Sequence, residues 1–164
     1  QQVGAQHRFI RFYEASGEAF EHFVEYMQGL GYVWGRHYLP HDGDTKRLGT
    51  VKNWTPRQML EDLGLRNVEI VDRIDRKINA IHLARQAMPS CWMDEENCKD
   101  GIVHLDLYRK QWDERMSTWK DEPRHDVHSN GADAFMQFAQ SQHIGGLTRR
   151  TVKRRPRSDS WRTA

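Results

Sequence analysis

Cysteine and long apolar runs are scarce in this sequence. The two cysteines, Cys91 and Cys98, are spaced as CWMDEENC and no second pair accompanies them, which excludes paired CxxC zinc motifs. Two free thiols are typical of a reducing compartment, so we expect a cytoplasmic protein. No run of eighteen apolar residues occurs, so no membrane span is expected. The opening QQVGAQHRF lacks the apolar segment that a signal peptide needs.

Two common catalytic motifs are also missing. The sequence contains no GxxxxGK[ST], the glycine-rich loop that cradles the phosphates of ATP. It contains no GxSxG, the turn that presents a nucleophilic serine. The sequence therefore contains no recognisable phosphate loop for ATP.

The composition is that of a single globular domain. Of the 164 residues, 37% are hydrophobic and 29% charged. The net charge of +2 conceals an asymmetry, because residues 148–164 hold seven basic residues and one acid. This tail carries +6, which leaves −4 on the body. A basic tail is typical of a segment that contacts a polyanion, and equally of a solvated, disordered terminus. The candidate DNA-binding residues in it are Arg149, Arg150, Lys153, Arg154, Arg155 and Arg157.

Hydrophobic periodicity predicts alternating strands and helices. Helices are expected near residues 17–30, 55–63, 74–88, 95–110 and 129–141, and strands at 7–16, 32–40, 68–73 and 90–94. The segment 108–119 is compatible with a longer helix or with a hairpin. The alternation indicates an α/β fold with a central mixed sheet.

The stretch HYLPHDGD places Asp42 directly after a strand that ends at Pro40. Ligand sites of α/β proteins form beyond the carboxyl ends of strands, so this carboxylate is a candidate site residue. The alternative is a turn aspartate that bonds to its own backbone.

A second acidic cluster lies in HDVHSNGADAFMQFA, residues 125–139. Asp133 falls inside the expected helix, where aspartate is a poor helix former, and Asp126 precedes it. Asp133 is also compatible with an exposed first-turn acid that the helix dipole favours. The small residues around it predict close approach of this helix to a sheet edge.

Two carboxylates from separate elements suit a hard cation such as Mg²⁺ or Mn²⁺, which prefers oxygen ligands. We therefore expect Asp42 and Asp133 to be catalytic metal ligands, with Asp126 as a further candidate. His41, His125 and His128 flank these acids and are expected to support them or to shuttle protons.

The ordered set FYEASGEAFEHFVEYMQGLGY, HYLPHDGDTKRLGT, MPSCWMDEENC and LDLYRKQWDERMSTWKDEPRHDVHSNGADAFMQFA resembles a known family. It is similar to the C-terminal nuclease domain of the large terminase subunit of tailed bacteriophages. The likeness covers about residues 1–142. It implies a domain at 1–143 with an RNase H-like mixed sheet flanked by helices. The basic segment that follows, at 144–164, is expected from its composition to be a disordered tail.

The resemblance also implies an activity and partners. A terminase nuclease uses Mg²⁺ or Mn²⁺ to cut concatemeric double-stranded DNA by two-metal hydrolysis, and works with the portal and the small terminase subunit in the host cytoplasm. Of the three metal-binding acids of the family, the second corresponds to Asp42 and the third to Asp133 or Asp126.

The chain departs from the family pattern at the first acid. The family places this acid in the opening strand, whereas no aspartate precedes Glu14 here. The first strand is therefore expected to be partly or wholly missing. Two other readings stay open: a non-catalytic fragment that binds DNA or the portal, and another nuclease of the same fold superfamily.

Overall fold

The computed structural model describes the backbone of residues 1–46 and 54–148, and the side chains within these ranges up to residue 142. It combines helices with short strands, so the expected α/β class is confirmed. The strands do not form one central sheet. In the described residues they divide among a three-stranded sheet, a parallel pair and a hairpin.

The three-stranded sheet contains the beginning of the described chain. Strand β1 (Gln2–Val3) runs antiparallel to β2 (Gln6–Phe9), and β2 runs parallel to β5 (Cys91–Met93). Strand β2 ends at Phe9, so most of the strand expected at 7–16 is irregular. Its residues instead bond to the loop after β5, where the Phe12 amide donates to the Asn97 carbonyl at 3.0 Å.

The parallel pair consists of β3 (His37–Leu39) and β4 (Val68–Ile70), in the register His37 to Val68 and Leu39 to Ile70. Helices α1 (Phe20–Gly29) and α2 (Pro56–Asp62) complete this part of the molecule. As predicted, Thr55 caps α2, and its side chain and that of Gln58 form a reciprocal capping box. A small core holds the unit together, made of Val24, Leu60, Leu65 and Val68.

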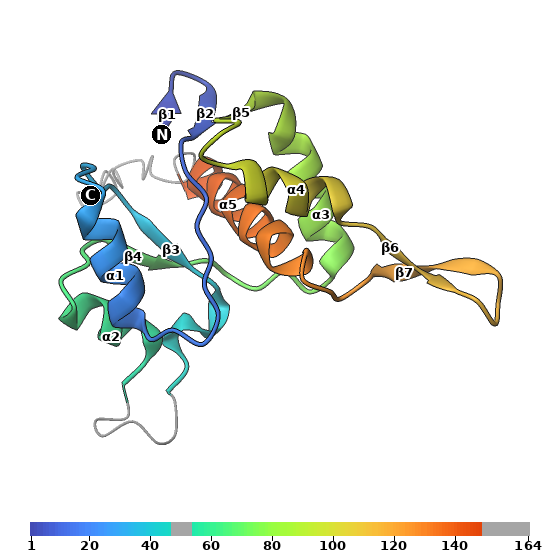
Figure 1. Cartoon of the computed structure of the whole chain (residues 1–164), viewed down its shortest axis with the longest axis horizontal. Coiled ribbons are helices and arrows are strands. Elements are labelled where there is room, and N and C mark those ends of the chain that lie inside the picture. The colour runs from blue at the N-terminus through green and yellow to red at the C-terminus, as the bar shows by residue number, and fades with distance from the viewer. Residues whose placement is uncertain (47–53, 149–164) are drawn as a thin grey trace, which may run out of the picture.

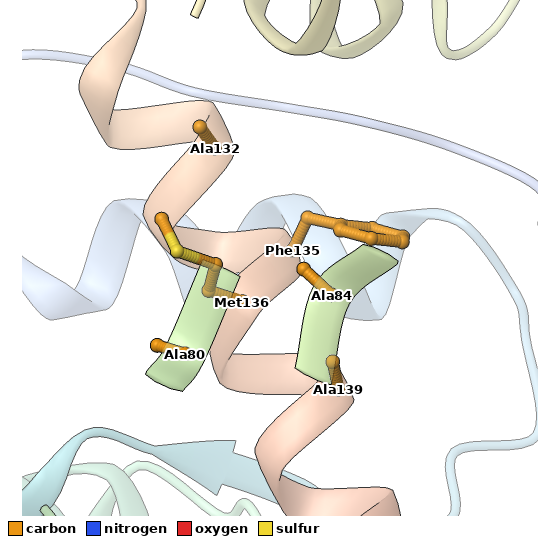
Figure 2. Close-up of a cluster of buried hydrophobic side chains, with 6 residues drawn as sticks. All are labelled: Ala80, Ala84, Ala132, Phe135, Met136 and Ala139. Atoms are coloured by element: carbon orange, nitrogen blue, oxygen red, sulfur yellow. The ribbon is translucent and has the colours of Figure 1, made fainter. Parts of the chain in front are cut away.

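The larger core lies between helices. Helix α3 (Lys77–Ala87) and α5 (Ser129–Thr148) pack together, and α4 (Lys99–Leu107) packs on α5 (Figure 1). Alanines at i and i+4 of α3 face a stripe at i, i+3, i+4 and i+7 of α5. Figure 2 shows the six buried side chains: Ala80, Ala84, Ala132, Phe135, Met136 and Ala139. Because four of the six are alanines, the two helices approach closely around one phenylalanine and one methionine.

The segment that was compatible with a helix or a hairpin forms a hairpin. Strands β6 (Lys110–Asp113) and β7 (Thr118–Pro123) pair antiparallel and extend away from the helices (Figure 1). Trp112 and Trp119 lie opposite each other, with ring centroids 5.0 Å apart. The 3₁₀ turns η1 (His41–Asp44) and η2 (Met88–Ser90) complete the elements.

Other boundaries differ from the predicted ones. The strand expected at 32–40 is confined to His37–Leu39, and the helix expected at 95–110 is confined to Lys99–Leu107. Helix α5 continues through Gly145 and Gly146, which were expected to begin the tail. The close approach predicted for its small residues is made to helices, since a Cβ on Gly131 would lie 2.8 Å from the ring of His104 in α4.

Both cysteines are free thiols, as predicted. Cys98 is buried and Cys91 half-buried, and burial raises the pKa of each thiol. Both therefore behave as small apolar side chains.

Candidate functional site

The HDGD turn presents Asp42 at the carboxyl end of β3. Gly43 is buried against the sheet, and a Cβ there would lie 2.8 Å from Ile70 Cδ1 and 2.9 Å from Leu39 Cβ. Only glycine lets the turn η1 settle on the ends of β3 and β4. Asp42 is consequently held at the surface, and among the described residues its carboxylate has no hydrogen-bond or ion-pair partner.

Two further acids follow β4 at the same edge. Parallel strands end on the same side, and the Val71 amide donates to the Leu39 carbonyl at 2.8 Å, which aligns the two exits. Asp72 and Asp75 come next and are exposed. Sequence reasoning overlooked them, although an acid directly after the apolar run VEIV is the same signal that selected Asp42.

Asp133 lies in the second turn of α5, next to the start of α3. Its carboxylate pairs with the Lys77 ammonium, and both side chains are about half exposed. Tyr108 lies nearby: burial, aided by the Asp133 charge, raises the pKa of its phenol to about 12. The buried Tyr108 hydroxyl has no partner among the described residues. Asp133 thus pairs with a cation and its charge acts on a buried phenol, and the sequence indicated neither of these neighbours.

The surroundings of Asp42 and Asp133 are connected by the segment that runs from β4 into α3. The connection from β4 runs to the start of α3, where Lys77 holds Asp133, and α5 also contacts β3 (Figure 1). No described hydrogen bond or ion pair joins the two acids directly. In the part of the chain that the structure describes, no three histidine, cysteine or acidic side chains gather closely enough to hold a metal ion.

Asp126 belongs to the turn that opens α5. Its carboxylate accepts from the His128 amide at 3.0 Å and lies 3.3 Å from Arg124 Nε. His125 Nδ1 lies 3.1 Å from Ser129 Oγ, which also donates to the Asp126 carbonyl. Asp126 and His125 therefore organise the start of α5. The remaining predicted histidine, His41, is exposed and lies beside Asp42 in η1.

His128 takes part in a chain of side chains that the sequence did not reveal. His104 is 7% exposed, and its Nε2 lies 2.9 Å from Glu14 Oε1. Its other nitrogen, Nδ1, lies 3.2 Å from His128 Nδ1. Both ring nitrogens of the buried His104 are engaged, so these hydrogen bonds fix the orientation of its ring.

The six basic tail residues, Arg149, Arg150, Lys153, Arg154, Arg155 and Arg157, lie outside the described residues. Among the helices that the structure describes, none is long and apolar enough to cross a membrane.

Comparisons with protein-family models, with curated proteins and with solved structures found no match for this chain.

Proposed function

We propose that this chain is the metal-dependent nuclease domain of a DNA-packaging terminase, with an RNase H-like arrangement and with Asp42 and Asp133 as its metal ligands. Mg²⁺ or Mn²⁺ is the expected cofactor, and double-stranded DNA is the expected substrate. The same proposal, through the sequence resemblance described above, gives the portal and the small terminase subunit as partners. It gives the host cytoplasm as the location.

The observation that carries this proposal is the environment of the Asp42 carboxylate. This carboxylate is exposed and unpartnered among the described residues, at the shared carboxyl edge of two parallel strands. A turn aspartate with only a structural role would bond to nearby backbone amides, as Asp126 does with the His128 amide. The glycine beneath Asp42 packs the turn down and leaves the carboxylate available for a ligand.

The available donors suit Mg²⁺ better than a metal that needs an all-protein cage. Mg²⁺ keeps several waters and is often held by one or two carboxylates together with substrate phosphates. Asp42 and Asp133 supply hard oxygen ligands and are both exposed, so waters and a phosphodiester have access to them. When bound, the ions would activate water and stabilise the leaving oxygen.

Lys77 occupies the Asp133 carboxylate in the described state. An ammonium and a divalent cation compete for the same oxygens, so Lys77 opposes metal entry at Asp133 until it is displaced. Replacing Lys77 with methionine keeps the aliphatic stem and removes the charge. We expect Lys77→Met to strengthen Mn²⁺ binding severalfold, measured by the paramagnetic broadening of the Asp133 amide.

A direct test uses Mn²⁺ as a paramagnetic probe. Bound Mn²⁺ should broaden the amides of η1 and of the first turns of α5 at the same metal concentration. Asp42→Asn should abolish both effects, whereas Asp106→Asn, at an exposed acid on α4, should leave them unchanged. Broadening of one segment alone would contradict a shared site.

Activity is the second readout. Nicking of plasmid DNA with Mn²⁺ should be lost in Asp42→Asn and in Asp133→Asn and kept in Asp106→Asn. Equal cutting by parent and Asp42→Asn would refute the assignment of the metal ligand.

The Lys77–Asp133 pair favours one alternative, a non-catalytic fragment that binds DNA or the portal. In that case Lys77→Met would not strengthen Mn²⁺ binding, and DNA binding would persist without divalent metal. Deleting residues 148–164 is expected to weaken DNA retention at low salt, because each contact between a basic side chain and a phosphate that is lost lowers the affinity for DNA.

A further inference from the structure

A surface hollow of about 360 Å³ lies where the β6–β7 hairpin meets the start of α5. Its walls are Leu107, Arg109, Arg124, Asp126, Val127 and His128. Leu107 and Val127 are exposed apolar side chains, 47% and 70% accessible. The hollow therefore combines guanidinium groups with an apolar wall, and it contains neither Asp42 nor Asp133.

The two arginines lie across from each other at the base of the hairpin. Lys110 pairs with Pro123, and one step further the Arg124 amide donates to the Arg109 carbonyl at 3.0 Å. Like charges at directly opposed strand positions are destabilising. Asp126 compensates Arg124, with its Oδ2 3.3 Å from Arg124 Nε. In the described residues no carboxylate pairs with Arg109, so the hollow retains one uncompensated positive charge.

The hydrogen-bonded series of side chains Glu14, His104 and His128 holds His128 in the wall of the hollow. The Glu14 carboxylate can only accept, so His104 Nε2 donates to it. When His104 is neutral, its Nδ1 therefore accepts from His128 Nδ1. His128 Nε2 takes no part in these hydrogen bonds, and with Nδ1 protonated it carries a lone pair that can accept from a ligand hydroxyl. Because His104 is almost fully buried, the His128 ring is oriented before any ligand arrives.

We propose that this hollow binds the phosphate group of a nucleotide. Arg109 and Arg124 supply two guanidiniums, which match the oxygens of a phosphate with paired N–H donors. Asp126 holds Arg124 in place, and the apolar wall of Leu107 and Val127 accommodates a base. Neutral His128, with its proton on Nδ1, can accept a hydrogen bond at Nε2 from a hydroxyl of the sugar. The nucleotide is either free or part of a nucleic-acid strand, since both present this chemistry.

The test titrates the full chain in EDTA, so that it does not depend on metal or on Asp42. Thymidine monophosphate is added while the Leu107 and Val127 amides are followed by NMR. Saturable shifts are expected, and Arg109→Gln should weaken the affinity by about tenfold, the effect of losing a charge-assisted hydrogen bond. Arg115→Gln, at the exposed hairpin turn, is the matched control and should leave the affinity unchanged. Circular dichroism should give unchanged melting for both variants.

A short DNA duplex then identifies the source of the phosphate. If the duplex competes with the mononucleotide, the hollow binds the DNA backbone; if it does not, the ligand is a free nucleotide. Absence of saturable binding at millimolar nucleotide would overturn the proposal. Equal weakening by Arg109→Gln and Arg115→Gln would also overturn it, because general surface charge would then explain the binding. An Asp42→Asn variant should bind the nucleotide like the parent, which separates this site from the nuclease site.

Discussion

Replacing Gly131 with alanine should destabilise the protein, although helix propensity alone predicts the opposite. In a helix interior, alanine is favoured over glycine by about 1 kcal/mol. At this position, however, the added Cβ would lie 2.8 Å from the Cβ, Cγ and Cδ2 atoms of His104. The Cβ of His104 is fixed to the α4 backbone and cannot swing aside. The helices must therefore separate or the imidazole must leave its place.

The expected magnitude follows from two opposing contributions. Overpacking costs about 1–3 kcal/mol, and a buried imidazole that loses its partners costs about another 1–3 kcal/mol. After subtracting the helix gain, the net loss is about 1 kcal/mol or more. Because the Glu14 carboxylate is 48% exposed, no further energy is assigned to its ion pair with His104.

Urea denaturation of the parent and of Gly131→Ala measures this loss, and the melting temperature should fall by about 2–4 °C per kcal/mol. Gly29→Ala, in α1, is the matched control, since nothing lies within 4 Å of a Cβ there. That control should be unchanged or stabilised by up to about 1 kcal/mol. If Gly131→Ala were as stable as the control, the described packing of α5 on α4 would be wrong.

Three further predictions concern packing, capping and titration. Phe135→Ala should lower the free energy of unfolding by about 3–5 kcal/mol, because its ring is the largest buried side chain between the helices. Trp92→Ala, at a largely exposed site, should change that free energy little in the same urea assay. Thr55→Ala should cost about 1 kcal/mol of stability through loss of the α2 cap, and Thr55→Ser should restore most of it. Burial should raise the pKa of the Tyr108 phenol to about 12, which a spectrophotometric titration of the parent and of Tyr108→Phe measures. The folded pKa of Tyr108 lies above the unfolded value near 10, so the contribution of its neutral phenol to stability is complete below pH 10 and is lost as the pH rises towards 12. Tyr108→Phe should remove this part of the pH dependence of the urea midpoint.

Local signals in the sequence predicted the helices better than the strands. Thr55 with Pro56 marked the start of α2, and the apolar stripe ending in Ala139 marked the core face of α5. These signals depend on neighbours three or four residues apart, which the sequence displays directly. The strands were predicted too long because aromatic and β-branched runs such as HRFIRFY favour extension, whereas strand length depends on having a partner strand alongside.

The sites were only partly predictable for a related reason. Asp42 stood out because it follows an apolar strand, and its exposed position agrees with that reading. The pairing of Lys77 with Asp133 joins residues 56 positions apart, and Glu14 meets His104 across 90 positions. No local pattern encodes such pairs, since they arise from how α3, α4 and α5 pack together.

Among the described residues, buried apolar side chains form two clusters, and this has a consequence for how the molecule opens. The β3–β4 unit depends on a cluster of four buried apolar side chains and on two strands of three residues each, whereas the cluster between the helices is larger. Short parallel pairs have little stability of their own. Amide protons of His37–Leu39 should therefore exchange with solvent sooner than those of Ala132–Met136. Exchange would occur by local unfolding of the β3–β4 unit, which bears Asp42, while the helices stay folded.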